Sequence, residues 1–157
     1  MTAKINRLIL SILLCQLIGN LGTFATINAI PAWYATLNRP PLSPPNWVFG
    51  PVWGTLFTLM GIALFLIWDN GIDKPANKKA IWIFVAQIVL NALWTFIFFA
   101  CKIPWMAFIE IVFLWIFIVW TIKAFYKVSK PAGWLLIPYI LWVSFAAYLN
   151  LAFAILN

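Results

Sequence analysis

The segment WYATLNRPPLSPPNWVFGPVW, which runs from Trp33 to Trp53, decides the fold because it sets five prolines between two long apolar stretches. Proline fixes the backbone angle φ, lacks an amide proton and keeps the preceding residue out of the α-helical region. The run from Arg39 to Pro45 therefore cannot be helical. We expect residues 31–46 to form an ordered, extended lid beside a bundle of helices.

Outside this segment the chain is apolar enough to lie in a membrane. It is 66% hydrophobic and 8% charged, whereas soluble domains carry roughly 25% charged residues. A helix needs about 20 residues to cross the hydrocarbon core, and the chain contains five stretches of that length. We therefore predict an all-α integral membrane protein with one transmembrane domain, residues 1–157, and helices at about 8–30, 47–68, 80–101, 104–126 and 134–156.

The positive charges gather on one side of this predicted bundle. The formal net charge is +7, but with five spans only Arg39 and Lys102 fall on the side opposite the N-terminus. Short loops rich in Lys and Arg stay in the cytoplasm, so we predict a cell-membrane protein with its N-terminus inside and its C-terminus and lid outside. This asymmetry accounts for the basic charge, and we expect no nucleic-acid partner. The cations on the N-terminal side are Lys4, Arg7, Lys74, Lys78, Lys79, Lys123, Lys127 and Lys130.

Polar side chains inside the spans recur at helical spacing. The two stripes are Gln87, Asn91 and Trp94 in the third span, and Trp142, Ala146 and Asn150 in the fifth. Residues three and four apart share one face of a helix, and amides in hydrocarbon need partners, so both stripes should face the bundle interior. Glu110 is the one acidic residue within a predicted span. We interpret it as a carboxyl group near the outer interface that bonds to neighbouring polar groups, since a proton pathway would need further ionisable groups.

The sequence lacks the residues that several classes of catalytic and metal-binding site require. The chain has no histidine and its two cysteines are far apart in sequence, so we predict no metal site. It has no Ser-His-Asp set, no paired carboxylates and no glycine-rich phosphate loop. A hydrolase or a nucleotide-driven pump is therefore excluded, and no cofactor is required.

The eleven tryptophans fall into two groups. Those near span ends are typical of the aromatic belt at a membrane surface, and they include Trp47, Trp68, Trp82, Trp105 and Trp134. Trp53, Trp94 and Trp142 lie deeper, on stripes that also carry small or polar residues. Two interpretations of this deeper group remain open: packing of the core, or the wall of a cavity for a flat apolar ligand with polar edges.

These residues resemble the signature of the tryptophan-rich sensory protein and translocator protein family, which includes the mitochondrial peripheral benzodiazepine receptor. The resemblance covers essentially the whole chain and implies five transmembrane helices around one pocket, closed by the loop between the first two helices, commonly in a homodimer. The matching motifs are Trp33-Tyr34-x-x-Leu37, Arg39-Pro40, Pro44-Pro45, the run from Trp47 to Gly54, Asn91-Ala92-x-Trp94, and the segment from Trp134 to Tyr139 with Trp142, Phe145-Ala146 and Leu149-Asn150.

The resemblance also implies ligands. Family members bind porphyrins and related tetrapyrroles as well as isoquinoline and benzodiazepine compounds, and eukaryotic members bind cholesterol. The sterol motif needs a basic residue after a tyrosine, and none follows Tyr148, so sterol binding through that motif is not expected. The pocket that the resemblance implies here consists of Tyr34, Pro44, Phe49, Trp53, Phe57, Asn91, Trp94, Trp142 and Ala146.

Three functional hypotheses follow. The first is a receptor or transporter-like protein with a sensory or homeostatic role, which binds tetrapyrroles through its aromatic residues, with Asn91 at a polar edge and Arg39 as partner of a propionate. The second, implied by the resemblance, is an enzyme that degrades porphyrin with light and oxygen through Trp53 and Trp142, the porphyrin itself supplying the chemistry. The third is a membrane scaffold without a small-molecule ligand.

Overall fold

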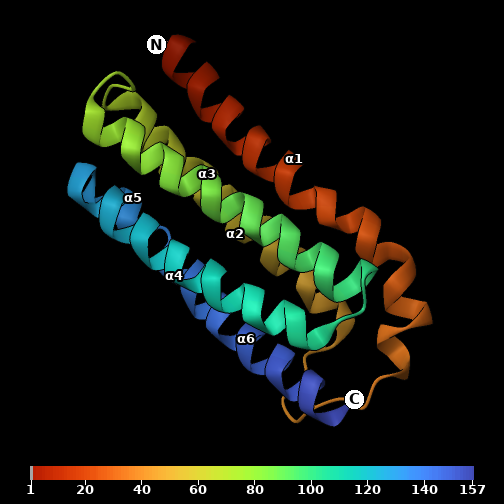
Figure 1. The fold of residues 1–157 in the computed structure, drawn as a ribbon. Coiled ribbons are helices and arrows are strands. Elements are labelled where there is room, and N and C mark those ends of the chain that lie inside the picture. The colour runs from red at the N-terminus through yellow and green to blue at the C-terminus, as the bar shows by residue number, and fades with distance from the viewer. Residues whose placement is uncertain (1) are drawn as a thin grey trace.

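The computed structural model of the chain describes residues 2–157, except for the side chain of Thr23, and every regular element in this range is helical. Five helical stretches are long and apolar enough to cross a membrane, which confirms the all-α class with five spans. The elements are α1 Thr2–Ala32, the 3-10 turn η1 Tyr34–Thr36, α2 Asn46–Asp69, α3 Pro75–Thr95, the π-helix η2 Phe96–Ala100, α4 Pro104–Val128, α5 Lys130–Trp134 and α6 Ile137–Leu156 (Figure 1).

Prolines determine where several helices begin and where one breaks. Pro75 and Pro104 are the first residues of α3 and α4, where the missing amide proton costs nothing. Pro138 breaks the last span, because a proline ring clashes with the carbonyl group four residues earlier. That residue is Trp134, where α5 ends. The fifth predicted span therefore consists of two helices, α5 and α6, joined by a tight turn.

Helices α1 and α3 begin before their predicted limits, and so does the fifth span, which begins at Lys130 rather than near residue 134. Helix α1 begins at Thr2 rather than near residue 8, and α3 begins at Pro75 rather than near residue 80. Lysine and arginine favour helix, so the charged flanks continue the helices past the apolar stretch. Asp69 Oδ2 lies 2.8 Å from Lys4 Nζ, and Asp69 Oδ1 lies 3.7 Å from Arg7 Nη1. These ion pairs connect the start of α1 to the end of α2.

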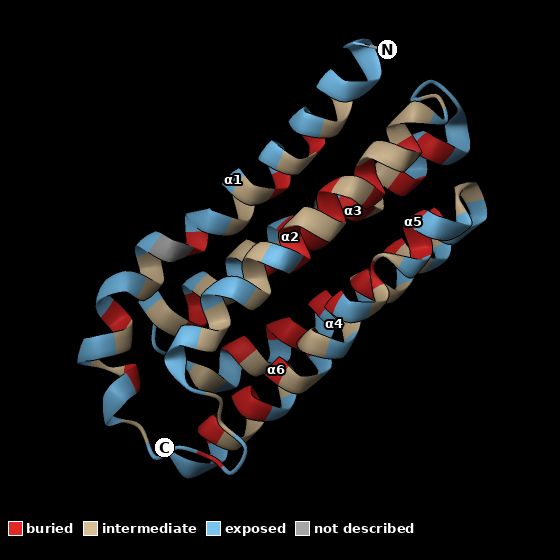
Figure 2. Cartoon of the chain, turned by 180° about the vertical axis from the view of Figure 1, so that it is seen from behind, coloured by how far each residue is buried: buried red, intermediate tan, exposed pale blue. Residues whose placement is uncertain are grey.

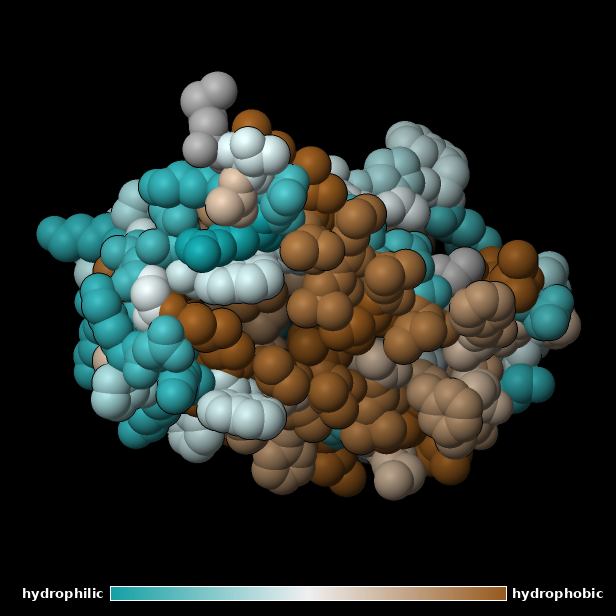
Figure 3. Space-filling view, turned by 90° about the horizontal axis from the view of Figure 1, so that it is seen from above, coloured by the Kyte–Doolittle hydropathy of each residue, from teal (hydrophilic) through white to brown (hydrophobic). Residues whose placement is uncertain are grey.

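The spans lie side by side along the long axis of the molecule. The N-terminus lies at the end that carries the α2–α3 turn and α5, and the C-terminus lies at the opposite end beside the lid (Figure 1). Helix α1 contacts α2 and α3, whereas α4 contacts α3, α5 and α6. Seen from above, apolar side chains form one broad area across the middle of the molecule, with hydrophilic side chains gathered mainly toward its left edge (Figure 3). This distribution suits a protein surrounded by lipid.

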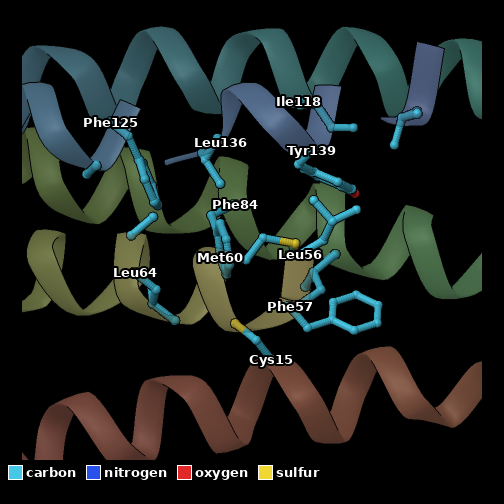
Figure 4. Close-up of a cluster of buried hydrophobic side chains, with 14 of the residues drawn as sticks. Cys15, Leu56, Phe57, Met60, Leu64, Phe84, Ile118, Phe125, Leu136 and Tyr139 are labelled. Carbon is cyan, nitrogen blue, oxygen red and sulfur yellow. The ribbon is translucent and has the colours of Figure 1, made fainter. Parts of the chain in front are cut away.

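The core runs between the inward faces of the spans. Buried residues lie on these faces, and α1 is largely exposed (Figure 2). Met60 of α2 and Phe84 of α3 lie at the centre of the cluster, which Cys15 reaches from α1 (Figure 4). The rings of Phe84 and Phe125 stack with their centroids 5.4 Å apart. The buried residues thus join all five spans into one core.

Glycines allow α1 to lie close to its neighbours. A Cβ atom on Gly61 of α2 would stand 2.5 Å from the Cα atom of Ile12, and one on Gly22 would stand 2.7 Å from Thr95 Cγ2. Small residues let helix backbones approach in membranes, where no hydrophobic effect drives helices together. The close approach of α1 sets one side of the cavity described next.

Candidate functional site

A cavity of about 300 Å³ lies between α1, α2, α3 and α6, in the half of the bundle nearer the lid. Small-molecule sites measure roughly 300–1,000 Å³ and combine apolar walls with a few polar groups. The wall here has that character. It consists of Gly19, Asn20, Gly22, Thr26, Ile30, Tyr34, Asn46, Phe49, Gly50, Trp53, Gly54, Phe57, Asn91, Trp94, Thr95, Phe98, Phe99, Ala146, Leu149, Asn150 and Phe153.

Two glycines of α2 leave the space open. Apart from the adjacent residues and the backbone of α2 itself, no atom lies within 4 Å of the position that a Cβ atom would take on Gly50 or Gly54. Interior helix glycines are otherwise unfavourable by about 1 kcal/mol relative to alanine. Gln16 Nε2 of α1 donates a 2.8 Å hydrogen bond to the carbonyl oxygen of Gly54, so the bare backbone also anchors the neighbouring helix. A larger side chain at Gly50 or Gly54 would therefore occupy space that belongs to the cavity.

A π-helix shapes the side of the cavity formed by the third span. In η2, Phe96–Ala100, the helix is wound more widely, and the amide of Cys101 bonds to the carbonyl oxygen of Phe96 at 3.1 Å. Such segments often occur at functional sites because they redirect side chains. Here Phe98 and Phe99 join the wall, and Phe98 stacks on Trp94 with ring centroids 5.6 Å apart. The sequence run FIFFA carries no signal for this winding, so neither phenylalanine was predicted.

Buried polar groups beside the cavity form two short chains of hydrogen bonds. In one, Asn91 Nδ2 donates to the Tyr139 hydroxyl oxygen at 3.2 Å, and that hydroxyl donates to Gln87 Oε1 at 2.9 Å. In the other, Trp94 Nε1 donates to Asn150 Oδ1 at 2.9 Å, and Asn150 Nδ2 donates to the Pro104 carbonyl oxygen at 2.8 Å. Both chains connect α3 to α6. They fix the side chains that line the polar part of the wall.

The lid lies at the end of the bundle next to the cavity. Within the lid, Arg39 Nη2 donates a 3.1 Å hydrogen bond to Asn46 Oδ1, and the guanidinium group lies 5.6 Å from the ring centroid of Tyr34. The Tyr148 hydroxyl of α6 donates to the Pro41 carbonyl oxygen at 3.3 Å. Tyr34 and Asn46 belong to the cavity wall. Arg39 thus lies at the lid side of the cavity, in contact with two of its wall residues.

A sequence profile of the TspO/MBR family matches residues 11–156. This chain belongs to the TspO/MBR family. It is 43% identical to the tryptophan-rich protein TspO of Chlorobaculum tepidum over 157 residues, which cover 100% of this chain and 99% of the relative. It is 40% identical to the tryptophan-rich protein TspO of Archaeoglobus fulgidus over 98% of this chain and 99% of the relative. It is also 37% identical to the translocator protein of Homo sapiens over 75% of this chain and 70% of the relative.

Most of the residues expected to form the pocket of this TspO/MBR protein come together in the structure. The cavity wall includes Tyr34, Phe49, Trp53, Phe57, Asn91, Trp94 and Ala146. Pro44 and Trp142 are not part of it. Their roles as ligand contacts stay predictions. The wall also contains two glycines of α1, Gly19 and Gly22.

The side chain of Phe49 separates Trp142 from the cavity of this family member. Its ring meets Phe49, a wall residue, edge to face at 6.0 Å, and it meets Phe145 at 5.7 Å. Its indole N–H is buried and has no hydrogen-bond partner within residues 2–157. Trp53 instead contributes to the wall and stacks on Phe57 at 5.4 Å. The two tryptophans expected to hold a ligand between them therefore differ in their access to the cavity.

The surroundings of Glu110 of α4 differ from those expected. Its side chain is buried, and both carboxylate oxygens lack a hydrogen-bond partner in the described part of the chain. The interpretation of a carboxyl group bonded to polar neighbours near the interface was therefore wrong. Glu110 lies in the second turn of α4, whose neighbours are α3 and α6, and its side chain is on the buried face of that helix. Among residues 2–157, no group of His, Cys, Asp or Glu side chains could hold a metal ion.

Proposed function

We propose that this TspO/MBR family member is a membrane receptor or transporter-like protein that binds porphyrins and related tetrapyrroles in the cavity between α1, α2, α3 and α6. The observation that carries the proposal is the composition of the wall, in which aromatic side chains surround a few fixed polar groups. Flat macrocycles gain affinity by stacking on aromatic faces and by burying apolar area. Isoquinoline and benzodiazepine compounds share these properties.

The positive charge of Arg39 in the lid favours a ligand with acidic groups at its edge. Arg39 is exposed and contacts Tyr34 and Asn46 at the lid side of the cavity. A guanidinium group pairs with carboxylates through two parallel hydrogen bonds. We propose that Arg39 leaves Asn46 to bind a propionate of the bound tetrapyrrole. The macrocycle would then lie in the apolar cavity with its acidic edge toward the lid.

The same proposal includes an orientation in the cell membrane. Lys74, Lys78 and Lys79 lie at the end of the bundle that carries the N-terminus, and the lid lies at the other end (Figure 1). By the charge rule for short loops, we place the N-terminus in the cytoplasm and the lid outside. The homodimer implied by the family resemblance stays a prediction.

One observation favours the light-dependent alternative. Trp53 forms part of the wall, so a porphyrin in the cavity would touch an indole that it could oxidise in light and air. Trp142, the other residue of that hypothesis, is not part of the wall. Loss of the porphyrin Soret band under illumination, compared with free porphyrin in the same nanodiscs, distinguishes degradation from simple binding.

The proposal is tested by titrating the protein with protoporphyrin IX in nanodiscs and in the dark. We expect saturable quenching of tryptophan fluorescence, and a Trp53→Leu variant should lose about tenfold in affinity as one stacking contact disappears. Trp82, which is 72% exposed on α3 outside the cavity, provides the control variant Trp82→Leu. If quenching does not saturate, or if Trp53→Leu and Trp82→Leu show the same quenching curve, porphyrin dissolves in the lipid, as the scaffold hypothesis predicts.

A further inference from the structure

An apolar groove of about 470 Å³ lies on the lipid-facing side of the third and fourth spans. It is separate from the cavity described above, and the two have no wall residue in common. Almost all of its surface is apolar. Its walls include Trp82, Ala86, Val89 and Leu90 of α3 with Phe113 and Phe117 of α4.

The shape of the groove favours a narrow occupant over another helix. Trp82, Val89 and Phe113 are exposed, whereas Ala86 and Phe117 are half-buried, so bulky side chains stand at the rim of the hollow. Helices in membranes pack closely through small residues, and Ala86 is the one small residue of this wall. A flexible hydrocarbon chain can follow such a hollow and gain dispersion contacts along it. The groove therefore suits a lipid acyl chain better than a second copy of the protein.

Two lysines of α3 continue the face that carries the groove. Lys78 and Lys79 lie four and three residues before Trp82, and residues at these spacings share one face of a helix. Both lysines are exposed. The helical rise from Lys79 to Leu90 is about 16 Å, roughly half of the ~30 Å thickness of the hydrocarbon core. The groove and the lysines together thus match the depth of one lipid leaflet.

Helix α4 carries a third lysine toward the same end of the groove. The ring of Trp120 lies beside that of Phe117 with centroids 5.1 Å apart, and Lys127 lies two helical turns beyond Trp120 on the same face. Lys127 is exposed. Helix α3 begins and α4 ends at the end of the bundle that carries the N-terminus (Figure 1). Both helices therefore bring lysines to the same end of the groove.

The positive charges at this end lack carboxylate partners in the protein. The chain has ten basic residues and three acidic ones, and the ion pairs within residues 2–157 join Asp69 to two basic residues of α1. Lys78, Lys79 and Lys127 form no ion pair in this range. The charge rule for short loops explains why cations lie on this side of the membrane. It does not require them to follow the faces that carry an apolar groove.

We propose that this groove and the three lysines bind one anionic phospholipid from the leaflet on the N-terminal side. An acyl chain lies along α3 and α4, and the phosphate lies among Lys78, Lys79 and Lys127. Basic residues beside a hydrophobic span attract anionic headgroups, and the groove adds contacts that hold one lipid in place. This site is independent of the proposed porphyrin site, because it uses another face of the bundle.

The test measures lipid binding to the full chain by native mass spectrometry from an uncharged detergent. The probes are phosphatidylglycerol and phosphatidylcholine with identical acyl chains. We expect one phosphatidylglycerol to bind at least about tenfold more tightly than phosphatidylcholine, through the attraction of the lysines for its net charge. A Lys78→Gln/Lys79→Gln variant should lose about tenfold in affinity for phosphatidylglycerol and keep its affinity for phosphatidylcholine. Ala86→Phe, which fills the groove, should weaken the binding of both lipids.

A matched control separates a specific site from general attraction to the basic end. Lys4→Gln/Arg7→Gln removes two cations at the same end of the molecule, on α1, which packs mainly on α2 and α3. This variant should keep the tenfold preference for phosphatidylglycerol. It breaks the ion pairs with Asp69, but exposed ion pairs contribute little to stability, so the variant should fold.

Three results would overturn the inference. The first is equal affinity of the unmodified protein for the two lipids. The second is an equal loss of affinity for phosphatidylglycerol in both double variants, since the attraction would then be general. The third is a dimer that Ala86→Phe dissociates without weakening the binding of phosphatidylglycerol, since a second copy would then cover the groove. Protoporphyrin IX should bind the Lys78→Gln/Lys79→Gln variant as it binds the unmodified protein, so the porphyrin proposal is tested separately.

Discussion

Asn38 in the lid and Asn157 at the end of α6 are joined by hydrogen bonds in both directions. The Asn38 amide donates to Asn157 Oδ1 at 2.8 Å, and Asn157 Nδ2 donates to the Asn38 carbonyl oxygen at 3.3 Å. The side chain of Asn157 thus satisfies both backbone groups of one lid residue. This contact fastens the lid to the end of the bundle that holds the cavity.

We expect an Asn157→Ala variant to release bound ligand faster. Each hydrogen bond contributes about 0.5–1.5 kcal/mol, and losing the two should raise the dissociation rate about tenfold if the lid must open for release. Stopped-flow displacement of protoporphyrin IX in the dark measures this rate. Asn70→Ala is the control, because among residues 2–157 Asn70 Nδ2 bonds to the Leu66 carbonyl oxygen of α2, far from the lid. An unchanged rate in Asn157→Ala would show that ligand leaves by a route that does not involve the lid.

Alanine at two glycines of α2 should have opposite effects on stability. Gly54→Ala adds a methyl group where no atom beyond the adjacent residues and the backbone of α2 lies within 4 Å, so it should stabilise the fold by up to about 1 kcal/mol through helix propensity. Gly61→Ala puts the methyl group 2.5 Å from the Ile12 Cα atom and should destabilise by about 1–3 kcal/mol as α1 is pushed away. Thermal unfolding in detergent compares the two. Equal effects would contradict the close packing of α1 on α2.

A larger residue at Gly54 should remove ligand binding without unfolding the protein. Gly54→Leu places a side chain in the open space of the cavity, so we expect porphyrin affinity to fall by at least about tenfold with the melting temperature unchanged or raised. Gly54→Ala should bind nearly as well as the unmodified protein. If Gly54→Leu keeps its affinity, the porphyrin binds elsewhere.

Replacing Glu110 with leucine should stabilise the fold. Its two carboxylate oxygens are buried and have no partner among residues 2–157, and a buried polar group without a partner costs about 1–3 kcal/mol. Leucine has a similar volume and no polar atoms, so unfolding should shift to higher temperature. Glu110→Gln, which keeps polar atoms, should gain less. A loss of stability or of porphyrin binding in Glu110→Leu would show that the carboxyl group has a partner or a role in the membrane.

Trp53 and Trp142 should contribute unequally to ligand binding. Trp53 belongs to the cavity wall, whereas Trp142 lies outside the wall and contacts Phe49, a wall residue, and Phe145. We expect Trp53→Leu to weaken porphyrin binding about tenfold and Trp142→Leu to weaken it less than about threefold. Equilibrium titration in the dark gives both values. A larger effect of Trp142→Leu would mean that the cavity rearranges around a ligand.

Sequence patterns predicted the part of this protein that depends on local chemistry. Proline stereochemistry excludes helix from Arg39 to Pro45, and the structure has no helix between Thr36 and Asn46. Apolar stretches of membrane length predicted the five spans that the structure contains. Helical spacing placed Asn91 and Trp94 on one face, and both contribute to the cavity wall. These features need only the properties of a residue and its near neighbours in the chain.

Only the tertiary structure decided the features that join residues far apart in sequence. The π-helical winding at Phe96–Ala100 depends on how the end of the third span packs, and it brings in two phenylalanines that periodicity could not identify. The contacts of Asn38 with Asn157 and of Tyr139 with Gln87 and Asn91 require particular placements of separate helices. A sequence determines which groups can donate and accept, but the packing of the spans determines which of them meet.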